Sequence, residues 1–257
     1  EKKNPDIVIN AAAKVGGIYA NNTKRADFII NNLKINLNIL EAVIEFNEIK
    51  VINLGSSCIY PLKAKNPIKE TDFMTGSLEP TNSPYAMAKL SAIEIGRSLK
   101  TQYGHDVINL MPTNLYGPND NFEENSSHVI PGLMRRMYDA KLSNKDTFEI
   151  WGTGKPLREF LYVDDLASAV EFILDNNIKD DIINIGSGVE ISILKLAELI
   201  KSVVGYKGIL LFDESMPDGN PRKLLDCSII NNYGWRHNVD LEDGLIKTYD
   251  WFKNNIS

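Results

Sequence analysis

Short apolar runs that alternate with helical patterns are the feature that most constrains how this chain folds. Strand-like runs cover residues 6–13, 50–55 and 105–111. Between them lie stretches at 25–47 and 83–103 whose apolar residues recur at helical spacing. This alternation predicts a parallel, doubly wound α/β sheet, in which ligands bind at the carboxyl ends of the strands.

The second half of the chain continues with strand and helix patterns and has no linker or internal repeat. Strand-like runs lie at 148–154, 158–165, 181–186 and 209–212, and helical patterns at 167–174, 191–205 and 241–254. We therefore expect a second, smaller α/β unit that packs directly onto the first.

Composition excludes several classes of protein. The net charge of −6 argues against nucleic-acid binding, and no apolar run reaches the ~18 residues of a membrane span. The three histidines are far apart, so no metal site is expected. Cys58 and Cys227 are also far apart, which argues against a disulfide scaffold and favours a reducing, cytoplasmic location.

Tyr85 and Lys89 are four residues apart, so they share one face of the helix predicted to start near Ser83 and Pro84. A phenol, with a pKa near ~10, is a poor acid or base at neutral pH. A neighbouring ammonium favours the phenolate, and we expect Lys89 to pull the pKa of Tyr85 toward the working range. Taken alone, the spacing is also common on exposed helix surfaces.

Polar side chains follow the two predicted strands that flank this helix. Ser56, Ser57 and Cys58 come directly after one strand, and Asn114 follows the other. Because the carboxyl ends of parallel strands form the binding edge of such a sheet, we interpret these residues as site residues. The alternative for Cys58 is a small buried apolar residue.

Ser56, Tyr85 and Lys89, in this order, resemble the active triad of the extended short-chain dehydrogenase/reductase superfamily, and the resemblance covers essentially the whole chain. Residues 158–165 (REFLYVDD) are similar to a signature of its nucleotide-sugar members. The resemblance implies a Rossmann-type fold. Ser56 would hold the sugar oxygen, Tyr85 would exchange its proton, and Lys89 would lower the Tyr85 pKa and bind the nicotinamide ribose.

Four motifs resemble more closely one family of that superfamily, the GDP-L-fucose synthases: residues 56–61 (SSCIYP), 112–118 (PTNLYGP), 127–131 (SHVIP) and 151–154 (WGTG). The resemblance implies that GDP-4-keto-6-deoxy-D-mannose is epimerised at C3 and C5 and then reduced at C4 with NADPH. Thiols and imidazoles both exchange protons near neutral pH. By match to the family, Cys58 is the base and His128 the acid.

The resemblance also implies binding residues and two domains. Expected NADP(H) contacts are Ala12, Ala13, Lys14, Asn36, Leu54, Lys89, Asn114, Leu115 and His128. Expected GDP-sugar contacts are Ser57, Asn114, Arg136, Trp151, Arg158 and Lys223. Residues 1–118 with 159–187 would form the dinucleotide-binding domain, and residues 119–158 with 188–257 the nucleotide-sugar-binding domain. The alternatives to ligand binding are surface ion pairing for the arginines and core packing for Trp151.

One departure from the superfamily concerns the first strand, its Gly-x-x-Gly-x-x-Gly turn and the following helix, which have no counterpart in the sequence. Gly16 and Gly17 match a later loop near the nicotinamide, where we expect the backbone to approach a ligand closely. If the protein begins at Glu1, we expect weak NADPH binding and aggregation through residues 6–13. A 28.8 kDa species that binds NADPH tightly would refute this expectation.

Two rival functions remain at this level. One is a related nucleotide-sugar epimerase without net reduction, and the other is a non-catalytic member that senses dinucleotide or acts as a scaffold. The presence of both Cys58 and His128 favours the epimerase/reductase. By resemblance, we expect a homodimer formed through helices near residues 30–46 and 86–103.

Overall fold

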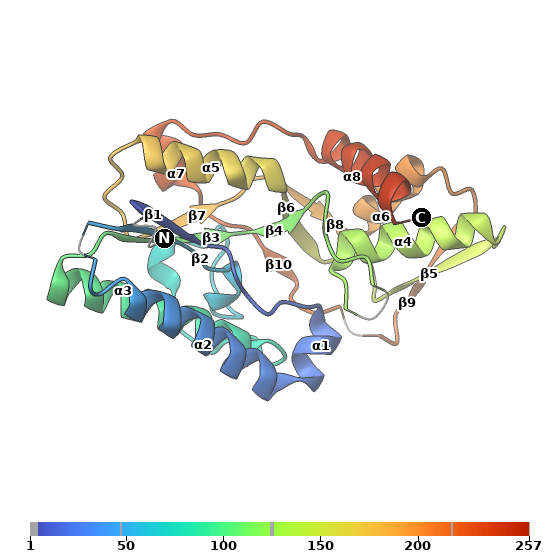
Figure 1. The fold of residues 1–257 in the computed structure, drawn as a ribbon. Helices are drawn as coiled ribbons and strands as arrows, with labels where there is room; N and C mark the ends of the chain where they lie inside the picture. The colour runs from blue at the N-terminus through green and yellow to red at the C-terminus, as the bar shows by residue number, and fades with distance from the viewer. Residues whose placement is uncertain (1–4, 47, 124–125, 217, 257) are drawn as a thin grey trace.

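A computed structural model describes residues 5–46, 48–123, 126–216 and 218–256. Its first lobe is built on a four-stranded parallel sheet in the order β1-β2-β3-β7 (Figure 1). These strands are β1 (Ile7–Asn10), β2 (Lys50–Leu54), β3 (Val107–Pro112) and β7 (Ile182–Ile185). The predicted doubly wound α/β fold is confirmed.

Helices cover both faces of this sheet. On one side lie α2 (Arg25–Ala42) and α3 (Ser83–Tyr103), which pack against each other, and on the other lie α5 (Val163–Asp175) and α7 (Ser228–Tyr233) (Figure 1). Glycine permits the close fit of α3, because a Cβ at Gly96 would lie 2.8 Å from Val107 Cγ1 on β3. Gly104, with φ of 81°, ends α3 in the left-handed conformation that glycine favours.

Within the residues that the structure describes, the second lobe contains two small sheets and three helices. One sheet joins β10 (Arg222–Lys223), β6 (Leu157–Tyr162) and β4 (Asn114–Tyr116), with β8 (Glu190–Ser192) antiparallel to β6. The other pairs β5 (Thr147–Trp151) with β9 (Ile209–Asp213). The helices are α4 (Val129–Leu142), α6 (Ile193–Val204) and α8 (Leu241–Asn255).

Each lobe has its own apolar core. The first core packs β2, β3 and β7 against α3 and α5, and the second packs α4, α6 and α8 around an aromatic cluster that includes Phe122, Tyr249 and Phe252. Leu225, Ile230 and Trp235 pack into the first core although they follow the second lobe's strands in sequence. After β10 the chain therefore enters the first lobe and then returns to the second lobe for α8.

Three asparagines at paired positions form a buried ladder of amides through the first sheet. Asn10, Asn53 and Asn109 are register partners on β1, β2 and β3. Asn10 Nδ2 donates to Asn53 Oδ1 at 2.9 Å, and Asn53 Nδ2 donates to Asn109 Oδ1 at 2.9 Å. Asn36 on α2 accepts from Asn10 at 3.3 Å and donates to the carbonyl of Ala88 on α3 at 3.1 Å. The ladder therefore ties the sheet to the helix that carries Tyr85.

Several local expectations differ from the structure. Ser83 is the first residue of α3 and not its N-cap; the N-cap is Asn82, whose side chain makes no capping bond. The predicted helix over 25–47 ends at Ala42. The short helix α1 (Ile18–Thr23), α7, and the short strands β4, β8 and β10 were not predicted, and two 3-10 turns, η1 (Ser57–Ile59) and η2 (Glu70–Asp72), lie after β2.

Candidate active site

Ser56 and Tyr85 meet at the carboxyl end of β2. Ser56 follows β2 directly, and its Oγ accepts a hydrogen bond from the backbone N–H of Cys58 at 3.2 Å, which caps η1. Tyr85 lies in the first turn of α3, where the side chain of Ser56 is close enough to its phenol to lower the pKa of Tyr85. The structure thus brings together the predicted serine and tyrosine of the triad.

Lys89 lies one turn after Tyr85 and is almost fully buried, with 2% of its surface exposed. Its Nζ donates to the carbonyl oxygen of Leu54 at 2.7 Å and lies 5.8 Å from the centroid of the Tyr85 ring. Burial lowers the pKa of Lys89 to about 8, and the charge of Cys58 partly opposes this shift. The ammonium is therefore fixed at the end of β2 and titrates just above neutral pH.

The expected lowering of the Tyr85 pKa by Lys89 is wrong in this structure. Burial raises the pKa of Tyr85, the negative charge of Cys58 raises it further, and the side chain of Ser56 only partly offsets the two. The spacing of Tyr85 and Lys89 could not reveal this, because the burial of a side chain depends on tertiary packing that sequence spacing does not report. Tyr85 is a neutral phenol, which suits it to donate a proton.

Cys58 lies in η1 with a half-buried, free thiol. Two side chains distant in sequence donate to its sulfur: Asn82 Nδ2 at 3.4 Å and Lys223 Nζ at 3.8 Å. Asn82 was not predicted as a site residue, because its only sequence signal is its place just before α3. Lys223 was expected to contact the GDP-sugar, and the structure places its ammonium beside the thiol.

His128 is the N-cap of α4 and is exposed. A positive charge on His128 lowers the pKa of Asp120, but burial of the Asp120 carboxyl has the larger effect and raises that pKa. No hydrogen bond joins His128 to Cys58 in the described ranges. The segment just before it is tied to the first lobe, because Gly17 N donates to Ser126 O at 3.0 Å. Gly17 therefore closely approaches the chain before α4, and this contact brings the loop after β1 beside His128.

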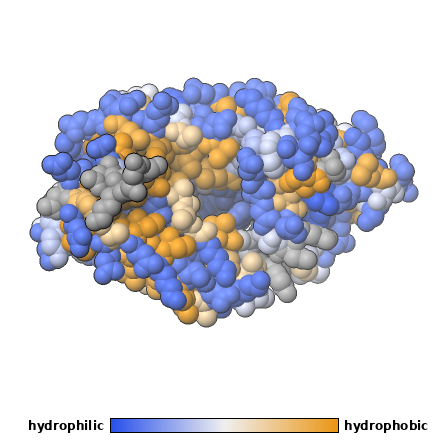
Figure 2. Space-filling view, in the orientation of Figure 1, coloured by the Kyte–Doolittle hydropathy of each residue, from blue (hydrophilic) through white to orange (hydrophobic). Residues whose placement is uncertain are grey.

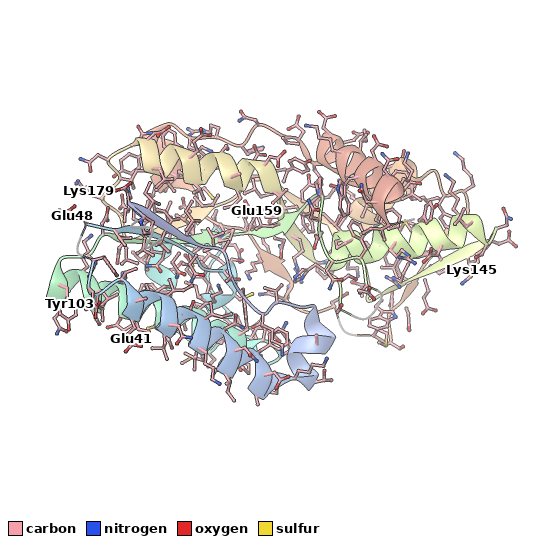
Figure 3. The ribbon with its side chains drawn as sticks, viewed as in Figure 1. Glu41, Glu48, Tyr103, Lys145, Glu159 and Lys179 are labelled. Carbon is pink, nitrogen blue, oxygen red and sulfur yellow. The ribbon has the colours of Figure 1, made fainter. Side chains whose placement is uncertain are left out.

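Asn114 and Glu159 hold the junction between the lobes. Asn114 Nδ2 donates to the backbone oxygen of Glu159 at 2.8 Å, and the Glu159 carboxylate accepts from the backbone N–H groups of Gly188 at 2.7 Å and Leu225 at 3.0 Å. Glu159 is fully buried at the centre of the molecule (Figure 3), and burial raises its pKa. The side chain of Leu115 packs on the first core. Sequence analysis did not single out Glu159, which stands inside an apolar strand pattern.

The residues expected to contact the cofactor after β1 lie at the same edge of the sheet. Ala12 and Ala13 follow the strand directly, and the backbone N–H of Ala12 donates to Asn10 Oδ1 at 3.2 Å. Lys14 pairs with Asp27 at 3.2 Å, and its main chain is held by Asn32. Asn36 is 1% exposed, and the amide ladder occupies both ends of its side chain.

The residues expected to contact the sugar nucleotide are more dispersed. Ser57 is buried, whereas Trp151 is 61% exposed at the end of β5. Arg136 lies 5.1 Å above the Phe148 ring and lines a cavity of about 670 Å³ between α4 and β5. This cavity is lined by none of the triad residues. Arg158 is paired with Lys223 across β6 and β10, and burial lowers its pKa while Asp218 opposes the shift.

This face of the molecule is hollowed near its centre, where β4 and β10 lie in Figure 1 (Figure 2). The ends of β1 and β2, the buried Lys89 ammonium and the Tyr85 phenol fit the nicotinamide-ribose half of a dinucleotide, whose hydroxyls need a fixed cation and a phenol within reach. Among the described residues, no group of histidines, cysteines and carboxylates could hold a metal ion. No helix in the described ranges is long and apolar enough to span a membrane.

Comparisons with known proteins agree with this geometry. The profile of the NAD dependent epimerase/dehydratase family matches residues 1–186. GDP-L-fucose synthase 1 of Arabidopsis thaliana is 52% identical over 99% of this chain and 79% of its own length. GDP-L-fucose synthase of Escherichia coli (strain K12) is 49% identical over 97% and 81%.

Among solved structures, a GDP-L-fucose synthetase from Naegleria fowleri bound to NADP superposes with a TM-score of 0.88 at 31% identity, over 98% of this chain and 78% of that one. The family profile and these relatives cover the triad and both lobes. The chain belongs to the NAD dependent epimerase/dehydratase family.

Proposed function

We propose that this protein converts GDP-4-keto-6-deoxy-D-mannose to GDP-L-fucose, by epimerisation at C3 and C5 followed by NADPH-dependent reduction at C4. One observation carries the proposal. A half-buried free thiol, Cys58, and a Ser56–Tyr85–Lys89 group occupy the same strand end, where Ser56 Oγ accepts from the backbone N–H of Cys58 and negative charge on Cys58 would raise the pKa of both Tyr85 and Lys89. A single sugar ring can therefore meet a proton-transfer thiol and a reduction site together. The similarity to GDP-L-fucose synthases of a plant and a bacterium supports the same substrate.

Epimerisation requires a proton to leave one face of the sugar and another to arrive on the opposite face. The 4-keto group acidifies the hydrogens at C3 and C5. The Cys58 thiolate removes such a proton and becomes a thiol, and the charge left on carbon spreads onto the keto oxygen. His128 returns a proton to the other face, and exchange with water resets both groups. The tie between Gly17 and Ser126 supports this role, because it holds the start of α4 against the first lobe.

Reduction at C4 uses the buried half of the site. Bound NADPH supplies the hydride. Ser56 holds the keto oxygen, Tyr85 donates its phenolic proton to that oxygen, and Lys89 binds the nicotinamide ribose. The raised pKa of Tyr85 supports its role as an acid, because the phenol keeps its proton until the oxygen becomes basic.

The remaining site residues bind the two ligands. The cofactor lies across the strand ends, near Ala12, Ala13, Lys14, Asn36, Leu54, Asn114, Leu115 and His128. GDP lies over the second lobe, near Ser57, Asn114, Arg136, Trp151, Arg158 and Lys223. Guanidinium forks suit diphosphate oxygens, and exposed Trp151 offers a flat surface for a ring. In the proposed division, residues 1–118 with 159–187 bind the dinucleotide and residues 119–158 with 188–257 bind the sugar nucleotide. The core packing departs from these bounds, because Leu225, Ile230 and Trp235 pack into the first core.

A homodimer is part of the proposal. Ile30 and Leu37 lie on one face of α2 and are about half exposed, as is Met87 on α3, so these helices present apolar surface to a second copy. A Leu37→Glu variant that elutes at half the native mass in light scattering would support this interface. A cytoplasmic location is also proposed, and the two free thiols support it.

One assay tests the reaction and separates its rivals. The protein is incubated with GDP-4-keto-6-deoxy-D-mannose and NADPH in heavy water, while NADPH absorbance and deuterium in the sugar are followed. The proposal predicts both NADPH consumption and deuterium uptake at two carbons. Deuterium uptake without NADPH consumption indicates an epimerase alone, and neither signal indicates a non-catalytic dinucleotide binder.

A further inference from the structure

Two hydrogen-bond donors converge on the Cys58 sulfur from opposite parts of the chain. Asn82 reaches it from the start of α3, and Lys223 reaches it from β10, 165 residues away in sequence. One donor is neutral and the other is cationic. A thiolate gains from both, because it is the nucleophilic and basic form of cysteine and is stabilised by adjacent positive charge and by hydrogen bonds.

Lys223 is held in place on both sides of its strand. β10 pairs with β6 so that Lys223 lies opposite Arg158, and the next residue, Leu224, donates to Asn66 Oδ1 at 2.7 Å and accepts from Ile68 N at 2.8 Å. Its own side chain crosses to the first lobe. The main chain of β10 therefore fixes where the ammonium lies, close to the thiol.

Asn82 does not make the side-chain hydrogen bond that an N-cap residue usually makes. As the N-cap of α3 its side chain could accept a hydrogen bond from a backbone N–H of the helix N-terminus and stabilise the helix, yet it makes no capping bond. Its Nδ2 donates to Cys58 instead, and its Oδ1 is buried without a hydrogen-bond partner in the described part of the chain. Glu79 orients the turn by accepting from the backbone N–H of Asn82 at 3.1 Å. A cap that gives up stability in this way is typical of functional residues.

We propose that Asn82 and Lys223 are positioning residues that hold the Cys58 thiolate ready to remove the sugar proton. The inference rests on the proposed function, because only a proton-transfer role for Cys58 makes the thiolate useful. Neither residue reaches the reacting carbon through this contact; each acts through the sulfur. Lys223 thus has a role on the first lobe's thiol besides its place beside the nucleotide.

Thiol alkylation tests the inference without substrate or cofactor. The native protein is treated with iodoacetamide at pH 7, and modification of Cys58 is followed by peptide mass spectrometry; Cys227 is buried and serves as an internal reference. Asn82→Asp is the decisive variant. A carboxylate at the N-cap position favours the helix N-terminus but places negative charge beside the sulfur, so the alkylation rate should fall about tenfold while the melting temperature holds or rises.

Lys223→Met should lower the alkylation rate about three- to tenfold, and Lys223→Arg should restore most of it because the positive charge returns. Lys179→Met is the matched control, since Lys179 is exposed at one end of the molecule, whereas Glu159, on the strand that pairs with β10, lies near its centre (Figure 3). Wild-type alkylation rates in both Asn82→Asp and Lys223→Met would overturn the inference. Equal losses in Lys223→Met and Lys223→Arg would overturn the part played by charge.

Deuterium uptake separates this inference from the proposed function. If Asn82→Asp slows alkylation and deuterium uptake together, both stand. If the variants slow alkylation but the wild-type protein takes up no deuterium, the thiolate is held as inferred and the proposed reaction is wrong. If the wild-type protein takes up deuterium and the variants alkylate normally, the reaction stands and the positioning role is wrong.

Discussion

The two halves of the site are built in opposite ways. Ser56, Tyr85 and Lys89 belong to one lobe and lie within one strand end and one helix turn, with Lys89 buried and Ser56 and Tyr85 half-buried. Cys58 and His128 are half-buried and exposed, and the groups around them come from both lobes. We infer that reduction depends on an acid, Tyr85, that one lobe alone holds in place. Epimerisation depends instead on the relative position of the two lobes, which places the groups around Cys58 and His128.

Tyr85→Phe should have the largest effect, and it tests whether reduction can be lost while epimerisation is kept. Loss of the acid should slow the oxidation of GDP-L-fucose by NADP⁺, the reverse of the reduction, about 10³-fold. Deuterium uptake into the keto sugar should fall less than about tenfold, because it depends on the other half. Tyr103→Phe, at the opposite end of the same helix, is the control (Figure 3). Equal losses in both assays would mean that the halves are not separable.

Cys58→Ser is the converse test: it should remove epimerisation while reduction is kept. A serine hydroxyl is a far weaker acid than a thiol, so deuterium uptake should fall about 10²- to 10³-fold. Oxidation of GDP-L-fucose by NADP⁺ should stay within about threefold, because Tyr85, Lys89 and Ser56 are unchanged. Full deuterium uptake in this variant would remove Cys58 from the mechanism.

The pH dependence should also differ between the halves. Lys89 has a pKa lowered to about 8, so its ammonium is present below pH 8 and is lost as the pH rises through that value. The rate of NADPH consumption, measured with the keto sugar, should therefore fall several-fold above pH 8. Deuterium uptake should not share this midpoint. A reduction rate that stays flat from pH 7 to 9.5 would contradict the role of Lys89.

Glu159→Gln, which alters the junction between the two lobes, should have the smallest effect on activity. The carboxylate accepts from Gly188 N and Leu225 N, whereas an amide can accept at only one of its two positions. The free energy of unfolding, measured in urea, should fall by about 2 kcal/mol. Deuterium uptake should drop a few-fold and GDP-L-fucose oxidation less, because Lys223 lies two residues from Leu225. Unchanged stability would mean that the junction tolerates the loss.

Local patterns predicted the frame of the first lobe well. The strands at 6–13, 50–55 and 105–111 and the helix that carries Tyr85 follow directly from apolar periodicity and from Pro84 and Gly104. Ser56, Tyr85 and Lys89 were singled out as a triad through their resemblance to the superfamily, because the Tyr-x-x-x-Lys spacing alone is also common on exposed helix surfaces. The structure then shows that they lie within one strand end and one helix turn.

What the sequence could not reveal depends on contacts between distant segments. β10 is only Arg222 and Lys223, a pair with no strand signal, and it exists because β6 offers a partner. The bond of Asn82 to Cys58 replaces the cap that its position predicts. The raised pKa of Tyr85 follows from burial by residues outside its helix, which no Tyr-x-x-x-Lys spacing reports.

The asparagine ladder has a consequence for how the sheet assembles. Asn10, Asn53 and Asn109 satisfy one another only when β1, β2 and β3 pair in the observed alignment. A shift of one residue turns each amide to the other face of the sheet, where it must lose its partners inside an apolar layer. Slipped pairings of these valine- and isoleucine-rich strands, which apolar contacts alone would tolerate, are thereby disfavoured. The ladder therefore selects the observed register of β1, β2 and β3. Because Ser56 directly follows β2, the same register also fixes the position of Ser56.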